Sequence, residues 1–372
     1  MKKKGVLVYF VNVDWFFVSH RLEIALESKN QGYEVHIIAG FTSHKESLEN
    51  YGFIVHDINL SRSSKSFLKE TKVLFESYRI LKKINIDILH LISIKPIIYG
   101  GLISKILRIK KIVYSFPGLG HIFTSNSISN YLLRVTSLLI YRLILKNKKS
   151  YVILQNKHDR DYLLSKKILR KENIIMIYGS GVHLDKFSFS NEPEGIPVVM
   201  MISRLLKEKG VIEYLESIDQ VKRSFPEVKF VLVGGFDDNP GSLSIRDIEE
   251  YIDLNKVEYW GKKENIYDTI KLSSIVVLPS YREGLPKVLI EAGASGKPIV
   301  TSDVPGCKDA IIENSTGLLV PPKKINDLSE AIIFLLKNKD IRIQMGKNGR
   351  KLAEEKFNIQ SVIEKHINIY NS

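Results

Sequence analysis

The 372-residue sequence predicts an α/β protein with two doubly wound domains. Short apolar runs alternate with amphipathic stretches along the chain, a pattern typical of parallel sheets that are covered by helices. A polar stretch with Pro and Gly, NEPEGIP at 191–197, interrupts this alternation. The charge balance changes at the same place, so we expect one domain on each side of it.

The predicted strands are short, apolar and rich in β-branched residues, as buried strands are. In the first half they are 5–11, 33–40, 53–60, 87–93, 111–116, 150–156 and 174–178. In the second half they are 196–203, 228–235, 257–261, 274–280, 297–303 and 317–322. Amphipathic stretches between them include 204–221 and 286–294, and residues 130–150 also have helical spacing.

Composition excludes several classes of protein. Hydrophobic residues make up 44% and charged residues 26%, which is typical of a globular chain. The single cysteine, Cys307, excludes an internal disulfide and indicates a reducing compartment. The start, MKKKGVLVYFVNVDWFF, lacks a small-residue cleavage site, so we expect no signal peptide. No apolar run has the length of a membrane span.

The positive charge is concentrated in the first half. Residues 1–190 hold 30 basic and 14 acidic side chains, whereas 191–372 hold 25 and 27. Residues 101–150 include nine basic side chains and no acidic one. This concentration of positive charge predicts a polyanionic partner, either nucleic acid or an anionic membrane surface. No helix-turn-helix, RNA-binding or zinc-finger signature is present, so we expect no nucleic-acid partner.

Two glutamates flank a predicted helix start in REGLPKVLIE, residues 282–291. Pro286 suits the first turn of a helix that follows a strand, and ligands bind at this edge of an open α/β sheet. Free N–H groups at the helix start favour a phosphate. One carboxylate could then bind a ribose diol and the other a sugar hydroxyl. The alternative is two solvated acids.

Two cations follow the first predicted strand of the second domain in SRLLKEKG, residues 203–210. Arg204 can bind a phosphate in bidentate fashion, and Lys209 adds a point charge. They could also be ordinary surface cations. However, both this segment and the Glu283–Glu291 segment follow strands of the same sheet, which strengthens the joint interpretation as a phosphate and sugar site.

Weaker signals are present elsewhere. The glycine pair in VLVGGFDDNPG, which includes Gly234, permits close backbone approach to a ligand or simply ends a strand. There is no Walker loop, serine-hydrolase elbow or metalloprotease motif. The histidines are scattered, so we expect no metal site; Asp237 and Asp238 are the only close acidic pair near the sheet edge.

Taken in order and spacing, these segments resemble the retaining GT-B glycosyltransferases of family four. The resemblance rests on Arg204 with Lys209–Gly210, VLVGG, VEYWG, LPSYREGLPKVLIEAGASGKPIVTSDVPG and TGLLVPP, and covers most of the second half. The first half is similar more loosely, through WFFVSHRLEIALESKNQGYEVHIIAG and DILHLISIKPIIYGGLISKILRIKKIVYS. FVLVGGFDDNP, VLPSYREG and LSRSS also look similar to bacterial transferases that extend undecaprenyl-diphosphate-linked glycans, including N-acetylgalactosaminyltransferases.

The resemblance implies two Rossmann-like domains with an interdomain cleft. Residues 1–188 would face acceptor and membrane, and 189–357 would bind the nucleotide sugar. A final helix, about 358–372, would return to the first domain.

The resemblance also implies roles for individual residues. Arg204 and Lys209 would hold the donor diphosphate, Glu291 the ribose hydroxyls and Glu283 the donor sugar. The Gly284–Leu285 turn would present backbone N–H groups. Other residues would lie near the donor: Gly234, Trp260 and Lys262.

One departure concerns the acceptor side. Relatives carry a histidine in a V-H-G segment where this chain has Pro117, and His121 follows in YSFPGLGHIF. His121 could serve catalysis or be a simple loop residue. Other acceptor-side candidates are His20, Arg21 and Lys95, of which Arg21 suits a lipid diphosphate.

The stretch 130–150 could lie in a membrane surface. Its apolar stripe consists of Leu132, Val135, Leu139 and Leu143, and its basic residues are Arg142, Lys146, Lys148 and Lys149. The alternative is a core helix whose basic end faces water.

We therefore expect a retaining enzyme that uses a UDP-sugar, requires no metal or other cofactor, and extends a lipid-linked saccharide in polysaccharide or glycan assembly. It would sit peripherally on the cytoplasmic face of the inner membrane. The alternatives are a sugar-nucleotide epimerase of the same fold and a non-catalytic membrane-bound partner of a glycan assembly complex.

Overall fold

The computed structural model describes residues 4–60, 67–120, 123, 128–146, 150–237, 239 and 241–372. The chain forms two compact units: Met1–Ser180 with Gln360–Ser372, and Gly181–Ile359. The first boundary thus lies after Ser180, whereas the sequence predicted residue 188. The segment that begins at Gly181 belongs to the second unit because Val182 pairs with the end of that unit. Its N–H donates to Phe357 O at 2.7 Å.

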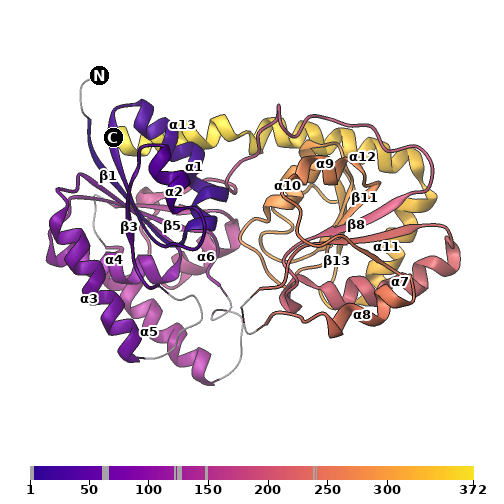
Figure 1. Ribbon diagram of the computed structural model, residues 1–372, viewed down its shortest axis with the longest axis horizontal. Coiled ribbons are helices and arrows are strands. Elements are labelled where there is room, and N and C mark those ends of the chain that lie inside the picture. The colour runs from indigo at the N-terminus through magenta and orange to yellow at the C-terminus, as the bar shows by residue number, and fades with distance from the viewer. Residues whose placement is uncertain are drawn as a thin grey trace. The chain divides into compact units, whose positions relative to one another are not determined.

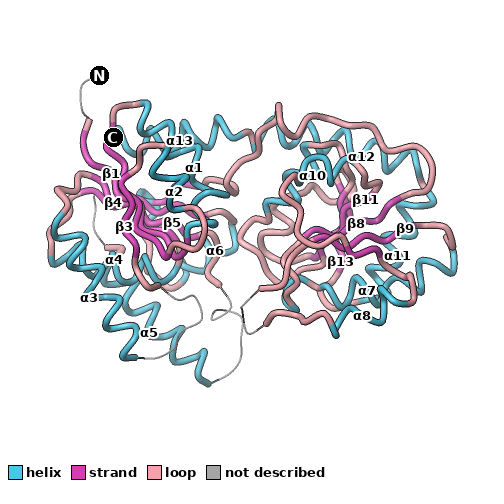
Figure 2. The backbone as a smooth tube through the Cα atoms, in the orientation of Figure 1, coloured by secondary structure: helices cyan, strands magenta, loops and turns pink. Residues whose placement is uncertain are grey.

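Unit 1 contains a seven-stranded sheet of order β3-β2-β1-β4-β5-β6-β7, and every pairing in it is parallel. Figure 2 shows this sheet as a twisted stack. Its strands are β1 (Gly5–Val13), β2 (Tyr33–Gly40), β3 (Ile54–Asp57), β4 (Ile88–Ile92), β5 (Lys111–Phe116), β6 (Ser150–Leu154) and β7 (Ile174–Met176). Central strands are mostly apolar because helices cover both faces.

Helices α1, α2 and α13 lie on one face of this sheet, and α3, α4 and α5 lie on the other (Figure 1). The helices of unit 1 are α1 (Asp14–Asn30), α2 (Lys45–Asn50), α3 (Phe67–Lys83), α4 (Ile94–Ile106), α5 (Ile128–Ile144), α6 (Lys157–Ser165) and η2 (Lys171–Asn173), with α13 (Ile359–Asn371) from the C-terminus. The sequence encodes some starts locally: Asn156 caps α6 by accepting the Asp159 N–H at 2.8 Å.

Unit 2 contains a six-stranded parallel sheet of order β10-β9-β8-β11-β12-β13. Its strands are β8 (Val198–Ile202), β9 (Lys229–Val233), β10 (Glu258–Tyr259), β11 (Ile275–Leu278), β12 (Ile299–Ser302) and β13 (Gly317–Val320). Its helices are η3 (Lys207–Lys209), α7 (Val211–Ser224), α8 (Arg246–Asp253), α9 (Ile266–Lys271), α10 (Lys287–Ala294), α11 (Ile325–Lys337), α12 (Lys339–Leu352) and η4 (Ala353–Phe357). In Figure 1, α7, α8 and α11 cover one face and α9, α10 and α12 the other.

The predicted α/β fold with two parallel sheets is confirmed, and every predicted strand is present. One helix begins later than the amphipathic pattern indicates: α7 starts at Val211 rather than at 204. Gly210 adopts a left-handed conformation with φ 76°, which ends the preceding turn and redirects the chain. No helix among the described residues has the length and apolar character needed to cross a membrane.

Candidate functional site

Loops that carry the predicted donor residues meet at one edge of the unit 2 sheet. Strand β8 pairs with β9 on one side and with β11 on the other. This is the point at which the strand order reverses, and in open α/β sheets ligands bind at the carboxyl ends of such strands. Arg204 follows β8, Asp237 follows β9 and Glu283 follows β11.

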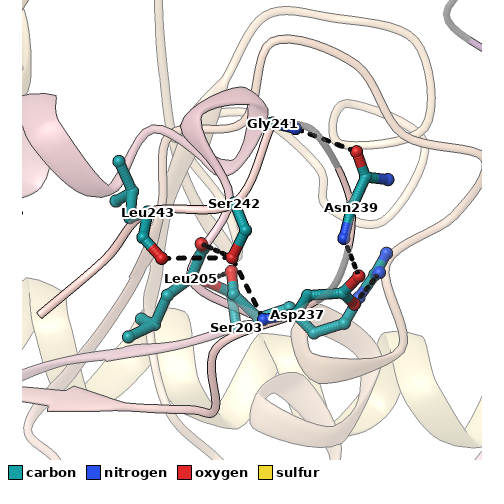
Figure 3. Close-up of polar contacts among 8 residues, drawn as sticks. Ser203, Leu205, Asp237, Asn239, Gly241, Ser242 and Leu243 are labelled. Carbon is teal, nitrogen blue, oxygen red and sulfur yellow. Dashed lines mark hydrogen bonds and ion pairs between the residues drawn. The ribbon is translucent and has the colours of Figure 1, made fainter.

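Arg204 forms an ion pair with Asp237, with 2.6 Å between Nη1 and Oδ2. The loop after β9 holds this carboxylate in place. The Asn239 N–H donates to Asp237 Oδ1 at 2.9 Å, and the Asp237 N–H donates to Ser242 Oγ at 3.0 Å. Figure 3 shows the same loop bound to the segment after β8, where Ser242 Oγ donates to the Leu205 carbonyl.

Lys209 forms a short ion pair with Glu283, and both side chains are mostly buried. Glu283 Oε1 also accepts a hydrogen bond from Ser280 Oγ at 2.9 Å. Gly210 permits this approach, because a Cβ there would lie 2.2 Å from Pro279 O. The structure therefore pairs Lys209, which the sequence analysis assigned to the donor diphosphate, with Glu283, which it assigned to the donor sugar.

Tyr281 connects the Glu283 loop to the segment that carries Lys209. Its N–H donates to Glu208 O at 2.9 Å, and its hydroxyl donates to Glu213 Oε1 of α7 at 2.5 Å. Burial and the neighbouring Glu213 carboxylate raise the pKa of this phenol, so the hydroxyl stays protonated and acts as a donor. Sequence reasoning missed this contact, because nothing in the spacing of positions 213 and 281 indicates it.

Glu291 lies in α10 and is 6% exposed. Burial raises the pKa of its carboxyl, and Lys287, with 3.4 Å between Nζ and Oε1, opposes that rise. The half-buried Lys287 beside the buried Glu291 carboxylate is suited to binding a neutral diol, because diol hydroxyls both donate and accept hydrogen bonds. Arg204, Lys209 and Lys287 are thus each paired with a carboxylate.

The Gly284–Leu285 turn lies against the loop after β12. The Glu283 N–H donates to Pro305 O at 3.2 Å. Gly306 adopts φ 85°, and a Cβ at this position would lie 2.5 Å from Glu283 O. The VPG sequence after β12 therefore supports the turn, a role that its Pro-Gly composition alone does not reveal.

Gly234, Trp260 and Lys262 lie at the carboxyl ends of β9 and β10. A Cβ on Gly234 would lie 1.7 Å from Ser203 O, so this glycine is required for packing between two loops. The Trp260 N–H donates to Leu232 O at 3.0 Å, extending the β9–β10 pairing. The Lys262 side chain is exposed and passes beside Gly235.

The acceptor candidates of unit 1 differ in accessibility. His20 and Arg21 lie within α1 rather than in a loop, because that helix begins directly after β1. Arg21 is 2% exposed and its Nη1 donates to His20 O, which corrects the expectation that it contacts a ligand. His20 stacks on Phe16 with 4.2 Å between ring centroids. Lys95 lies at the start of α4 and pairs with Glu70 at 2.7 Å.

His121, Lys148 and Lys149 lie outside the described residues. Arg142 and Lys146 are exposed at the end of α5. The apolar stripe of that helix is also exposed, so residues outside the stripe form the face of α5 that packs in the core. The exposed fractions are 60% for Leu132, 36% for Val135, 59% for Leu139 and 52% for Leu143. Tyr141 and Ile144 form the buried face of α5.

Among the described residues, no group of three or more His, Cys, Asp or Glu side chains is arranged to hold a metal ion. Asp238 lies outside those residues. Asp237, the described member of the acidic pair, is occupied by Arg204.

Family models match both halves of this chain. Residues 6–156 match the model described as glycosyl transferase 4-like, and residues 184–352 match glycosyl transferases group 1. The chain therefore belongs to the group 1 glycosyltransferases of the GT-B fold.

Two relatives are similar over most of their length. The chain is 29% identical over 364 residues to the N,N'-diacetylbacillosaminyl-diphospho-undecaprenol alpha-1,3-N-acetylgalactosaminyltransferase of Campylobacter jejuni, covering 94% of each chain. It is 26% identical to the UDP-Gal:alpha-D-GlcNAc-diphosphoundecaprenol alpha-1,3-galactosyltransferase of Escherichia coli, covering 82% of this chain and 80% of that protein. A glycosyltransferase structure from Rickettsia africae has the same fold, with a TM-score of 0.79, 22% identity and coverage of 100% and 98%.

Proposed function

We propose that this glycosyltransferase moves a hexose or N-acetylhexosamine from a UDP-sugar to a saccharide on undecaprenyl diphosphate, with retention of the anomeric configuration. The observation that carries the proposal is that Arg204, Lys209 and Glu283 lie in the loops at the carboxyl edge of β8 and β11, with Glu291 in the helix that follows β11, where a diphosphate and a ribose would bind. The names of the Campylobacter and Escherichia coli relatives support the lipid-linked acceptor, and the second supports the UDP-sugar donor.

In this proposal, Arg204 and Lys209 bind the donor diphosphate and stabilise the negative charge that develops on departing UDP. Such preorganised electrostatic stabilisation is usually the largest catalytic contribution, and two cations supply it without a metal. Glu291 accepts hydrogen bonds from the ribose hydroxyls. Glu283, released from Lys209 when that lysine binds phosphate, contacts the donor sugar together with the Gly284–Leu285 turn.

On the acceptor side, Lys95 is the candidate that remains at the carboxyl edge of the unit 1 sheet, directly after β4. Its side chain is about one-fifth exposed in the pair with Glu70, so a lipid diphosphate would compete with that carboxylate. His121 stays a candidate whose role the acceptor assay below tests through a His121→Ala variant.

The test of the reaction is a matrix of UDP-sugars against short-chain polyprenyl-diphosphate saccharides, read by mass spectrometry, with NMR of the product to assign the anomeric configuration. We expect one donor to add a single sugar with its configuration retained. Transfer only to free sugars, epimerisation of the donor, or inversion would each overturn the corresponding part of the proposal.

We also propose that α5 contacts an anionic membrane. Its stripe exposes leucine side chains that water solvates poorly, while Arg142 and Lys146 lie beside them. A helix with apolar and basic residues and no acid is typical of one that lies in a bilayer surface. Each basic residue near such a surface contributes about 1 kcal/mol, and this contribution weakens with salt.

Liposome flotation tests this contact. Wild type should bind vesicles that contain phosphatidylglycerol, bind neutral vesicles weakly and dissociate at high salt. A variant with Arg142, Lys146, Lys148 and Lys149 changed to Gln should bind less, as should one with Leu132, Leu139 and Leu143 changed to Gln. Both should still bind UDP. Equal flotation of wild type and both variants would show that α5 is not the contact.

A further inference from the structure

A cavity of about 540 Å³ lies in unit 1 where α4 and α5 end and β5 begins. Three isoleucines, Ile109, Ile112 and Ile144, form its apolar lining and are at most 9% exposed. Four exposed cations surround them: Lys105, Arg108, Lys110 and Lys146. No acidic side chain is among the described residues that line it. Because β5 starts here, the cavity is at the amino edge of the sheet, away from the acceptor candidate Lys95.

The local backbone builds this arrangement. After α4 ends, Arg108 adopts a left-handed conformation with φ 56°. The Ile109 N–H then donates to Ser104 O at 2.9 Å, so the chain turns back towards β5. This turn leaves the Arg108 and Lys110 side chains exposed. Ile109, which lies between them in the sequence, is buried. At the other wall, α5 ends at the buried Ile144, and the exposed Lys146 follows in the next turn.

The charges favour an anion in this cavity. Basic residues at helix C-termini often do no more than offset the helix dipole. Each C-terminus carries about half a negative elementary charge, so the ends of α4 and α5 together offset about one of the four cations around this cavity. The remaining positive charge surrounds an apolar lining. A ligand with a phosphate and an attached apolar part would satisfy both features, whereas a fully hydrated anion would satisfy only the first.

The surface next to the cavity is apolar as well. Ile106 at the end of α4 is 67% exposed and Leu143 of α5 is 52% exposed. Helices α4 and α5 pack side by side on the same face of the sheet (Figure 1). The cavity therefore lies at the end of α5, the helix proposed above to contact a membrane.

We propose that this cavity binds the phosphate of an anionic glycerophospholipid, with its glycerol and first acyl carbons against the three isoleucines. The inference rests on the membrane contact proposed for α5 and adds a specific headgroup site to it. Lys105, Arg108 and Lys110 act here as phosphate ligands. They take no part in the donor site of unit 2.

The experiment uses the full chain labelled at isoleucine δ1 methyl groups and observed by NMR. The probe is dihexanoyl-phosphatidylglycerol below its micelle concentration, so no membrane is required. We expect saturable shifts at Ile109, Ile112 and Ile144. Changing Lys105, Arg108 and Lys110 to Gln should weaken this binding at least about tenfold. A control that removes equal charge from exposed lysines of unit 2, Lys337, Lys339 and Lys347, should leave it unchanged.

Two further ligands separate the possible sources of the phosphate. Dihexanoyl-phosphatidylcholine should bind more weakly, and inorganic phosphate should cause no comparable shifts at equal concentration. Equal affinity for inorganic phosphate would overturn the lipid assignment in favour of a free-phosphate site. Unchanged binding in the triple variant, with its UDP affinity and unfolding midpoint intact, would overturn the cavity as the site. The assay needs neither donor sugar nor acceptor, so a failure of the proposed reaction does not affect it. Absence of vesicle binding by the wild type, with its methyl shifts intact, would instead refute the α5 contact alone.

Discussion

Asp237 holds Arg204 at the carboxyl edge of the unit 2 sheet, with 2.6 Å between the carboxylate oxygen and the guanidinium nitrogen. The carboxylate does not depend on the arginine for its position, because the Asn239 N–H and the Ser242 hydroxyl orient its loop. A fixed negative charge thus lies beside a cation that we propose binds diphosphate, and the two anions would compete for the same guanidinium.

This competition predicts the effect of Asp237→Asn. Removal of the charge should tighten UDP binding several-fold, because the pair is only partly buried and solvent weakens the repulsion. Calorimetry measures this change, and Asp253→Asn on the exposed end of α8 is the matched control. Weaker UDP binding in Asp237→Asn would instead show that the aspartate mainly positions Arg204.

Removal of either phosphate ligand should reduce catalysis more than stability. We expect Arg204→Ala and Lys209→Ala each to lower turnover by at least about tenfold, which corresponds to about 1.4 kcal/mol in the barrier. Lys207→Ala, in the same short helix but exposed, should be nearly neutral. Steady-state kinetics and a thermal unfolding midpoint for each variant provide the measurement. Near-normal rates for both variants would refute the diphosphate assignment.

Glu291→Ala should mainly weaken nucleotide binding. In wild type, we expect UDP to bind more tightly than 2′,3′-dideoxy-UDP, because the buried carboxylate accepts hydrogen bonds from the ribose. That preference should disappear in the variant. Calorimetry with both nucleotides gives the comparison, and a preference that persists in Glu291→Ala would show that another group reads the ribose.

Chelation should leave the activity intact. Asp237, the described residue closest to a metal-binding pattern, is paired with Arg204, and two cations already neutralise a diphosphate in the proposed mechanism. We expect equal initial rates with EDTA and with added magnesium. Loss of activity in EDTA that magnesium restores would contradict the two-cation mechanism.

Acid should destabilise unit 1 through the contact of α13 with its sheet. Burial and the nearby Arg21 lower the pKa of His366 to about 3, and burial also lowers that of His90, whose Nδ1 lies 2.7 Å from the Tyr370 hydroxyl. The unfolded chain binds protons at these histidines below about pH 6.5, whereas the folded chain does not. The free energy of unfolding should therefore fall as pH decreases below 6.5, by up to about 1.4 kcal/mol per pH unit for each histidine.

The urea midpoint at pH 7 and pH 5 measures this dependence. His366→Leu should reduce the difference between the two pH values, and His158→Leu, which replaces an exposed histidine, should not. An equal pH dependence in wild type and His366→Leu would show that other groups cause the acid sensitivity.

The sequence by itself determined the strands, the two-sheet organisation and the family. These features depend on local patterns: continuous apolar runs for strands buried on both faces, and glycines and prolines at fixed distances from strand ends. The placement of Arg204, Lys209 and Glu283 at one edge of a sheet could be predicted for the same reason, because each lies in a segment that follows a strand and parallel strands bring their carboxyl ends to one edge.

Only the tertiary structure decided which side chains are paired and which are accessible. Asp237 and Arg204 come from separate loops, and Tyr281 and Glu213 come from a loop and a helix. No periodicity relates the positions of either pair in the chain. Arg21 was predicted to bind a ligand but is buried, because α1 begins immediately after β1 and turns that position towards the sheet and α13. The leucine stripe of α5 has the same spacing that a core helix would have, and its exposure depends on which face of the helix packs against the core of unit 1. Burial and long-range pairing result from the packing of segments that are distant in the sequence. Local patterns of residues do not predict which of these segments pack together.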